Sequence, residues 1–595
     1  MSLYAYMVKR AGTEVPGAGP ITQNTAQPTP PAPLPGLDTK DSSVLRKGRW
    51  ITSPHLLPGY SPRPHQIKAV NKLLENNGKM IMVHDTGTGK TSSAIYGYEL
   101  QRHLGRVKKV VVITPAGLRE NFAEGGVAKF TNSTYVIARR PTEVDPTKDY
   151  NIVSYETFRQ DPVGIMQRSG ADMIIADEFH RNRNTQTGVY QSLMAARPYA
   201  KSFIGLTASF INNNPSEIAS LLSVSENNPA LTAREFKQKF TQTVGLSRGF
   251  TGTSKKLVGI KDEAGFAKAV YPKVDFVATS DIPGNDMPRK QVTDVSVPMS
   301  DEQYRLYSLA LKKLGPVKEY ITRRDPNISV KDAEQVFMQI GQARQVANSV
   351  GMGRKDVTPE QSAERTPKVK KLLDDTVTHL AEKPDNNVVL YSNLVNGGID
   401  VLTAGLKTRG IAPALFIGKG TEVGDNHVTE KSRQQGVRDY QDGKKRVIVI
   451  SGAGAEGLNL PSSTAFFALD GNFNPERILQ AEARARRLGG QAQRKPEDRV
   501  VDVRRYQSAV PVSERPGFFG RLVGRQPEQT TDEWMYGVAR VKKQTSTQFT
   551  DTLHNAHKYI RKEYGPNGVK YVYREKTSPG LLGYITGNNV EPKPF

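Results

Sequence analysis

The sequence predicts an α/β protein with two parallel sheets, each covered by helices, and a helical insertion between them. Short apolar runs alternate with helical patterns in two separate blocks, and the runs are unbroken, as in strands that are buried on both faces. With 595 residues, the chain is long enough for several domains. We expect five segments: a Pro-rich arm (1–60), a first α/β block (61–225), a helical insertion and linker (226–365), a second α/β block (366–510) and a basic C-terminal extension (511–595).

Ten apolar runs mark the expected strands. In the first block they lie at 80–84, 109–114, 151–155, 173–177 and 202–206. In the second block they lie at 387–392, 412–418, 446–451, 465–470 and 500–506. The insertion instead carries helical patterns at 301–314 and 330–350. The N-terminal arm is rich in Pro, Thr and Gly and poor in apolar residues, which predicts a disordered or extended segment.

Positive charge is the main feature of the composition. The chain has 83 Lys and Arg residues against 59 Asp and Glu residues, a net charge of +24. This excess favours a nucleic-acid partner, although charge that serves only solubility is an alternative. The absence of Cys excludes disulfides, Cys-ligated zinc and thiol catalysis. The apolar runs are too short to span a membrane and the first residues lack a signal-peptide pattern, so we expect an intracellular, non-secreted protein with no membrane partner.

A phosphate-binding loop is the sharpest motif. It follows the strand expected at 80–84 and opens a helix, and its residues are Asp85, Thr86, Gly87, Thr88, Gly89, Lys90 and Thr91. The glycines let backbone N–H groups curl around phosphates, Lys90 supplies positive charge to the β- and γ-phosphates, and Thr91 offers a hydroxyl to Mg²⁺. His84 stands where the usual pattern has its first Gly.

An acidic pair follows the strand expected at 173–177. Asp177 and Glu178 lie at the carboxyl end of that strand, where parallel sheets present their ligands. We expect Asp177 to hold Mg²⁺ and Glu178 to orient or deprotonate the attacking water. Such a pair is most often a solvated turn, but its position after a phosphate loop favours catalysis.

A third motif is a helix expected at 475–488, with Pro475 at its start and Gly489 past its end. Its spacing places three side chains on one face: Gln480, Arg484 and Arg487. A solvated basic face is the simplest interpretation.

Nine motifs in order carry a resemblance to a known family. They are RPHQ (63–66), HDTGTGKT (84–91), ITPAGLRENF (113–122), IVSYETF (152–158), DEFHRNRN (177–184), GLTASFINNNPSEIASLLS (205–223), VVLYSNLVNGG (388–398), SGAGAEGLNLP (451–461) and QAEARARRLGGQ (480–491). Together they resemble superfamily 2 helicase-like ATPases of the Snf2 type. Within that group they are most similar to the Snf2-like ATPases of large DNA viruses and phages.

The resemblance implies two RecA-like lobes with ATP and Mg²⁺ between them. By position, Gln66 would read adenine, and Gly457 and Asn459 would lie near the ribose and phosphates. Arg484 and Arg487 would act as arginine fingers on the γ-phosphate. The resemblance also implies two further roles. His180 would link the Mg²⁺ site to the second lobe, and Thr207 and Ser209 would couple the phosphate site to nucleic acid. On local grounds alone, several of these residues are equally well explained as caps and turns.

The resemblance further implies DNA contacts at four loops, which carry Thr114 and Pro115, Ser154, Ser392 and Asn393, and Ser451. They should touch phosphates and sugars rather than bases. The predicted function is an ATP- and Mg²⁺-dependent translocase on DNA, most simply duplex DNA, with RNA possible and protein partners unknown. Viral transcription or genome handling would be its setting, in a virion or in the nucleus or cytoplasm of a host. One alternative is a strand-separating DNA or RNA helicase, although no hairpin is evident in the sequence. Another is a virion-packaged structural protein that binds nucleic acid and has a secondary ATPase.

Overall fold

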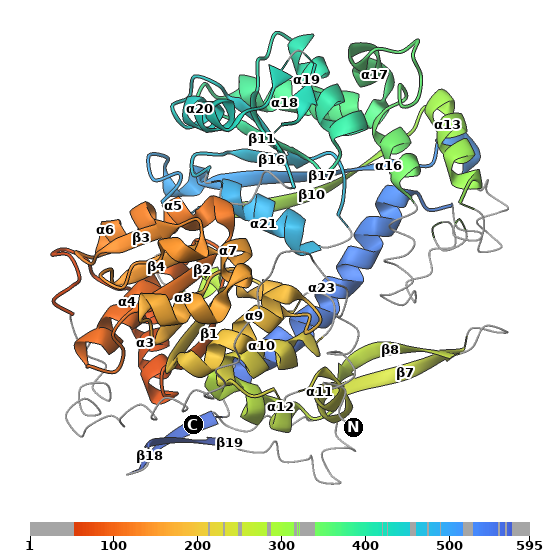
Figure 1. Cartoon of the computed structure of the whole chain (residues 1–595). Coiled ribbons are helices and arrows are strands. Elements are labelled where there is room, and N and C mark those ends of the chain that lie inside the picture. Colours follow the sequence, from red (N-terminus) through yellow and green to blue (C-terminus); the bar gives the residue numbers. More distant parts are fainter. Residues whose placement is uncertain are drawn as a thin grey trace, which may run out of the picture.

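Two parallel sheets, one above the other in Figure 1, form the architecture of the chain. The computed structural model describes residues 53–573, except 212–214, 230–231, 248–252, 283–286, 315–317, 319–320, 322–339, 419, 425, 453–457, 459, 473–474, 488, 516–527, 557–559 and 566–567. Residues 1–52 of the predicted N-terminal arm (1–60) therefore lie outside the described residues. The α/β fold with two parallel-sheet lobes is confirmed.

The first lobe contains a seven-stranded sheet in the order β3-β4-β2-β5-β6-β1-β9, and all neighbouring strands in it are parallel. Five of its strands match the apolar runs of the first block within a residue at either end. The strands are β1 Lys79–His84, β2 Val110–Thr114, β3 Tyr135–Ala138, β4 Tyr150–Ser154, β5 Met173–Ala176, β6 Ser202–Thr207 and β9 Val274–Val277. The short strands β3 and β9 are additional to the prediction.

Helices cover both faces of this sheet (Figure 1). Successive side chains of a strand point to opposite faces, so each strand packs against helices on both sides. Met80 and Met82 of β1 pack into one apolar cluster, and Ile81 and Val83 into another. On the first face lie α3 Pro64–Glu75 and α4 Lys90–His103. The remaining helices of the lobe are α5 Arg119–Phe122, α6 Ala128–Phe130, α7 Tyr155–Gln160, α8 Pro162–Ser169, α9 Gly188–Ala196, α10 Glu217–Glu226, α11 Ala233–Phe240 and α12 Glu263–Val270.

The second lobe contains a six-stranded parallel sheet in the order β10-β17-β16-β11-β15-β12. Its strands are β10 Arg289–Pro298, β11 Val388–Ser392, β12 Ala414–Phe416, β15 Val447–Ser451, β16 Ala465–Ala468 and β17 Val500–Ala509. Its helices are α13 Asp301–Lys312, α16 Gly341–Asn348, α17 Pro359–Arg365, α18 Pro367–Glu382, α19 Asp400–Lys407, α20 Glu430–Gln441 and α21 Pro475–Ala485. A small antiparallel pair, β13 Glu422–Val423 and β14 Asn426–His427, lies beside them.

The segment 226–365, predicted as a helical insertion and linker, is shared between the two lobes. It gives β9 to the first sheet and β10 to the second, so the chain crosses between the lobes after Val277 and before Arg289. It also forms an antiparallel hairpin of β7 Thr241–Ser247 and β8 Thr253–Ile260. Strand β10 carries no apolar run because it lies at the sheet edge, and most of its residues are exposed. A search for apolar runs therefore misses it.

One long helix, α23 Thr531–Ala556, spans both lobes (Figure 1). Its 26 residues correspond to a length of about 39 Å at 1.5 Å per residue. Near its start, Trp534 and Met535 pack with α13 and α16 of the second lobe. Near its end, Phe549 and Leu553 join the core of the first lobe, where the rings of Phe549 and Phe266 meet edge to face. The predicted basic C-terminal extension is thus, in its described part, a link between the lobes.

A second hairpin follows α23, formed by β18 Ile560–Gly565 and β19 Gly568–Tyr573. Among the described residues, no helix combines the length and the hydropathy that a membrane span requires.

A buried ion pair fixes the start of α23 to the second lobe. Lys368 Nζ of α18 donates to Asp532 Oδ2 at 2.5 Å and to Asn348 Oδ1 at 2.6 Å, and the side chains of Lys368 and Asp532 are each 1% exposed. Ser508 N also donates to Asp532. Removal of one partner would leave the other charge buried and unpaired, which is far more costly than the loss of a surface pair.

We expect Asp532→Ala to destabilise the second lobe by about 3 kcal/mol and to lower the midpoint of thermal unfolding by several degrees. The matched control is Asp442→Ala, which breaks an exposed pair with Lys444 in the same lobe and should change stability by less than about 1 kcal/mol. Equal midpoints for the two variants would show that the buried pair contributes no more than a surface pair.

Candidate nucleotide site between the two lobes

The phosphate loop, residues 85–91, connects β1 to the start of α4. Gly87 and Gly89 have φ values of +85° and +87°, a conformation that residues with a side chain rarely adopt. A Cβ atom on Gly89 would also lie 2.6 Å from Nε2 of Gln66, so there is no space for one. Glycine at these two positions lets the backbone form the concave turn that binds phosphate.

The side chain of Lys90 folds back over this loop. Its Nζ donates to the carbonyl oxygen of His84 at 2.8 Å and to that of Asp85 at 3.1 Å. Burial lowers the pKa of Lys90 to about 8, against the opposing attraction of Glu178 and Asp177. The amine therefore lies where a polyphosphate would need a cation, in surroundings that disfavour its charge until an anion arrives.

The beginning of the loop is held by Asp275 of β9 and by Thr279, which follows this strand. Neither residue was predicted from the sequence. His84 is fully buried, and its Nε2 lies 2.9 Å from Oδ2 of Asp275 on β9. Oδ2 of Asp85 accepts from the backbone N–H of Thr279 at 2.9 Å and from its hydroxyl at 3.2 Å. Histidine in place of the usual glycine thus has a partner on the neighbouring strand. Asp275 and Thr279 lie about 190 residues away along the chain, in no motif, so no sequence signal marks them.

The acidic pair lies at the carboxyl end of β5, beside the phosphate loop. Oδ2 of Asp177 accepts from the hydroxyl of Thr114 at 3.0 Å, and its Oδ1 accepts from the backbone N–H of Glu178 at 3.0 Å. Burial and the adjacent charge of Glu178 raise the pKa of Asp177. The pKa of Glu178 is lowered although burial opposes this, because His180, Lys90 and Arg484 all stabilise its negative charge.

A chain of polar contacts leads from Glu178 to the end of β6. Nδ1 of His180 lies 3.2 Å from Oε2 of Glu178 and 3.4 Å from the hydroxyl oxygen of Thr207. That hydroxyl accepts from the backbone N–H of Ser209 at 3.1 Å, and the guanidinium of Arg183 donates to Oγ of Ser209 at 2.8 Å. His180, Thr207 and Ser209 are thus brought together beside the acidic pair, where the resemblance implied a coupling role.

Phe210, the residue after Ser209, is buried and packs edge to face against Phe276 of β9.

Two arginines of the second lobe reach this site, Arg484 from the predicted helix and Arg487 from beyond its end. Helix α21 ends at Ala485, three residues earlier than expected, so Arg484 belongs to its last turn while Arg487 follows it. Arg484 and Arg487 both interact electrostatically with Glu178. Burial, with the neighbouring charge of Arg484, lowers the pKa of Arg487 to about 10, and Glu178 opposes this. Nε of Arg487 is buried and makes no hydrogen bond to the part of the chain that the structure describes.

Gln66 lies at the junction between α3 and the phosphate loop and is 5% exposed. Its Oε1 accepts from the backbone N–H of Arg63 at 2.8 Å, and its Nε2 donates to Oγ of Ser92 at 2.7 Å. It also lines a cavity of about 460 Å³ together with Tyr60 and Phe130, whose ring centroids are 5.1 Å apart. An aromatic cavity beside the phosphate loop has the shape and chemistry for a planar base.

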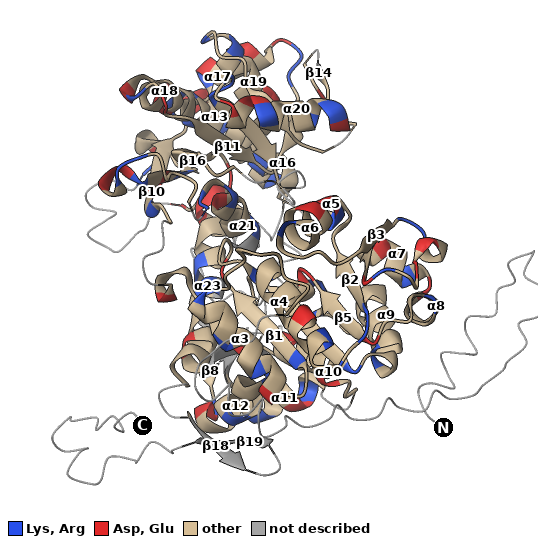
Figure 2. Cartoon of the chain, turned by 90° about the vertical axis from the view of Figure 1, so that its left-hand side faces the viewer, with Lys and Arg blue, Asp and Glu red and all other residues tan. Residues whose placement is uncertain are grey.

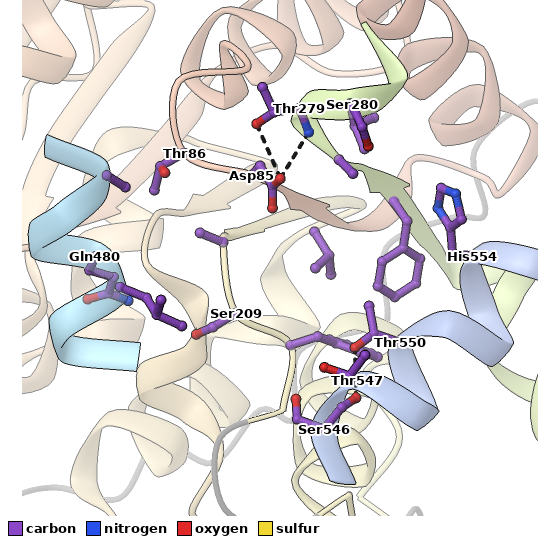
Figure 3. A pocket seen from close by; sticks show the side chains of 18 of the residues that line it. Asp85, Thr86, Ser209, Thr279, Ser280, Gln480, Ser546, Thr547, Thr550 and His554 are labelled. Atoms are coloured by element: carbon purple, nitrogen blue, oxygen red, sulfur yellow. Dashed lines mark hydrogen bonds between the residues drawn. The ribbon is translucent and has the colours of Figure 1, made fainter. Parts of the chain in front are cut away.

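A second cavity, of about 530 Å³, lies on another side of the loop (Figure 3). Asp85 and Thr86 line it from the loop, Gln480 from α21, and Ser546 and other hydroxyl side chains from α23. The hydroxyl of Ser546 donates to the carbonyl oxygen of Ile211 at 3.1 Å. Thr86 and Gln480 therefore meet where the first lobe, α21 and α23 come together.

The hydroxyl residues of the loops expected to contact DNA have buried side chains. Thr114, Ser154, Ser392 and Ser451 are each at most 5% exposed. Three of them bond inside the protein: Thr114 to Asp177, Ser154 as the cap of α7, and Ser392 to Asp470. These hydroxyls lie at strand ends, and contact of the loops themselves with DNA stays a prediction. Gly457 and Asn459 lie outside the described residues.

Two family models match most of this architecture. The SNF2-related domain matches residues 65–352, and the helicase conserved C-terminal domain matches residues 368–489. The chain belongs to the Snf2-type ATPases of superfamily 2. The resemblance drawn from nine motifs is thereby confirmed, and the Snf2-type chain is an ATP hydrolase.

Curated relatives are distant but extend over most of this Snf2-type chain. An uncharacterized ATP-dependent helicase of Bacillus subtilis, YqhH, is 24% identical over 74% of this chain and 75% of its own length. A RAD54-like DNA repair and recombination protein of Drosophila grimshawi is 24% identical over 73% of this chain and 59% of its own length. Among solved structures, the SWI2/SNF2 ATPase core of Sulfolobus solfataricus in complex with dsDNA has a TM-score of 0.35 and 17% identity, over 84% of this chain and 98% of that one.

The pKa of Lys90 predicts a pH dependence of ATP binding. Because ATP binds the protonated amine, and the pKa in the free protein is about 8, the dissociation constant should be constant below that pH. Above it, the constant should rise by about tenfold per pH unit until the pKa of the complex is passed.

Titration with a fluorescent, non-hydrolysable ATP analogue between about pH 7 and about pH 9.5 measures this dependence. The control is Lys90→Met, which should bind weakly at every pH and lose the rise. A wild-type constant that does not change with pH would mean that Lys90 keeps an ordinary pKa.

Proposed function

We propose that ATP and Mg²⁺ bind between the two lobes and that hydrolysis drives movement along DNA. One observation carries this proposal: Arg484 and Arg487 of the second lobe act on the same carboxylate, Glu178, that faces Lys90 of the first lobe. Residues about 400 positions apart converge on one site only because the lobes meet there. An enclosed site with cations from both sides suits a polyphosphate whose charge must be held during hydrolysis.

The described residues fit such a ligand. The backbone of 85–89 and the amine of Lys90 would hold the phosphates, and the cavity beside Tyr60 would take the base. No cluster of three or more acidic or histidine side chains in the described ranges could hold a metal on its own. Mg²⁺ would therefore bind through phosphate oxygens together with Thr91 and Asp177, and when bound it would neutralise charge on the phosphates.

The catalytic roles follow from the protonation states. Glu178 has a lowered pKa and stays ionised, so its carboxylate can orient a water molecule and accept a proton from it. The unsatisfied Nε–H of Arg487 is a donor ready for charge that develops on the γ-phosphate. Neither role needs a large rearrangement of the closed site.

DNA is the polymer that this chain best fits. The net charge of +24 favours a polyanion, and in the view of Figure 2 Lys and Arg occur on both lobes, interspersed with Asp and Glu. Relatives support DNA through the RAD54-like repair proteins. A mimivirus relative that is 23% identical is named as an ATP-dependent RNA helicase, so RNA is an alternative polymer. This relative also supports a role in viral transcription or genome handling.

Strand separation is a second candidate, favoured by one feature. The hairpin of β7 and β8 pairs with no other described strand and extends from the base of the first lobe (Figure 1). The structure thus contains a hairpin in this lobe, although none is evident in the sequence.

The deciding experiment measures ATP turnover with no nucleic acid, single-stranded DNA, duplex DNA and RNA side by side. We expect duplex DNA to stimulate most, and Lys90→Ala to be inactive throughout. Displacement of a third strand from a triplex reports translocation, and release of a strand from a forked duplex reports unwinding. Equal turnover in all four conditions would contradict a nucleic-acid motor.

Arg487→Ala tests the two-lobe site. Loss of this guanidinium should lower DNA-stimulated turnover by about 10³-fold, because it removes charge that stabilises the transition state. ATP affinity should change much less, since the ground state gains little from the same group.

The matched control for that variant is Arg494→Ala. Arg494 follows in the same lobe but bonds to Asp385 and Asn386, away from the site. Turnover of Arg487→Ala close to that of the control would contradict the proposal that the second lobe completes the site.

A further inference from the structure

Arg486 lies between the two arginines of the nucleotide site in the sequence, yet its side chain is used elsewhere. Its Nε donates to the carbonyl oxygen of Pro288 at 2.6 Å. Pro288 belongs to the connection through which the chain crosses between the lobes, after Val277 and before Arg289. Burial lowers the pKa of Arg486, so the guanidinium is partly removed from water where it makes this bond.

The same connection also holds the phosphate loop. The backbone N–H of Asp85, the first residue of the loop, donates to the carbonyl oxygen of Val277 at 2.9 Å. Oδ2 of Asp85 accepts from the backbone N–H and the hydroxyl of Thr279, and Figure 3 shows both bonds, with Gln480 of α21 on the other side of the cavity. One stretch of chain therefore contacts the phosphate loop of the first lobe and, through Pro288, the arginine segment of the second.

Arg487 depends on its neighbours for its position. Helix α21 ends at Ala485, so Arg487 lies beyond the last helical residue. Nε of Arg487 is buried and makes no hydrogen bond within the described part of the chain. Its guanidinium is therefore placed by the backbone that carries it. The bond from Arg486 to Pro288 fixes the residue immediately before it.

Glu482 fixes the helix on the same side, four residues before Arg486. Its side chain is 2% exposed, and both of its carboxylate oxygens are used. Oε1 accepts from Nε and Nη2 of Arg505 on β17 at 2.9 Å and 2.8 Å, and Oε2 accepts from Nζ of Lys290. Lys290 is the second residue of β10 and follows directly after the connection. The end of the connection thus holds both α21 and the residue that follows it.

We propose that Arg486 is a positioning residue for Arg487, and that the connection between the lobes places Arg487 opposite the phosphate loop. Thr279 holds the loop through Asp85, and Pro288 holds Arg487 through Arg486, so the two sides of the site are fixed by one stretch of chain. Arg486 itself touches no reacting group. The proposal rests on the proposed function, in which Arg487 acts on the γ-phosphate, and adds what sets the position of that arginine.

The test is Arg486→Met, which removes the donor and the charge and keeps an unbranched side chain. DNA-stimulated turnover at saturating ATP should fall by about tenfold, because a displacement of about 1 Å at a group that acts on the transition state can cost even more. The dissociation constant for a non-hydrolysable ATP analogue should stay within about twofold of the wild type. Weaker binding of the analogue with normal turnover at saturation would mean that Arg486 acts on the nucleotide by its charge, and the proposal would be wrong.

A double-mutant cycle shows whether Arg486 acts through Arg487. In the Arg487→Ala background, Arg486→Met should lower turnover by less than about twofold, because the group that it positions is already absent. Single-turnover hydrolysis of radiolabelled ATP with enzyme in excess measures the low rates of both variants. A further tenfold loss in this background would show that the two residues act independently, which contradicts positioning.

The control is Arg446→Met in the same lobe. Arg446 precedes β15, at the amino end of the strand, and it also donates from Nε to a backbone carbonyl oxygen, that of Asn386 at 2.8 Å. It makes two further bonds to backbone carbonyl oxygens, so its loss should lower the midpoint of thermal unfolding at least as much as that of Arg486. Turnover of this variant should stay normal. A tenfold loss of turnover in both variants would indicate an effect of stability and would overturn the proposal.

Failure of this proposal is distinguishable from failure of the proposed function. If Arg487→Ala has normal turnover, the site completed by the second lobe is wrong, and this is seen before Arg486 is changed. If Arg487→Ala is impaired while Arg486→Met is normal, the proposed function stands and only the positioning role is rejected.

Discussion

Burial of charge at the lobe interface is the constraint on which the site depends. Lys90, Arg484 and Arg487 lie near two carboxylates, Asp177 and Glu178, where water is largely excluded. Burial lowers the pKa values of Lys90 and Arg487, which reflects the cost of holding these cations there. In the proposed function, the negative charge of a bound polyphosphate would offset this cost and stabilise the closed arrangement.

The two sheets provide the geometry that this constraint requires. Parallel strands end at a common edge, and that edge in the first lobe carries the phosphate loop after β1, the acidic pair after β5 and Thr207 at the end of β6. Strand β9 adds Asp275, and the turn after it adds Thr279; these two residues bond to His84 and Asp85 at the beginning of the loop. Strong, rigid strands thus position loops whose own backbone is strained, most clearly at Glu178.

The two α/β blocks could be predicted from the sequence, because buried parallel strands leave unbroken apolar runs. The motifs of the phosphate loop and the acidic pair, predicted to form one site, lie together in the structure. The prediction missed β10, whose edge position leaves it polar, and it extended α21 past Ala485, because helix caps and spacing do not show where tertiary contacts end a helix. Nor does the sequence show that the hydroxyl residues at strand ends are buried, because their burial depends on packing that no local pattern encodes. Asp275, beside His84, is a long-range partner with no local signal.

The position of α23 late in the sequence affects when the two lobes can be joined during synthesis. Its start is fixed to the second lobe by Lys368 and Asp532, and its end is fixed to the first by Phe549 and Leu553. During synthesis, each lobe can fold as its own strands leave the ribosome, since domains fold largely as units. The helix that ties them together is translated last among these elements. The nascent chain therefore exposes two half-sites, and it gains the paired arrangement only after residue 556 has emerged.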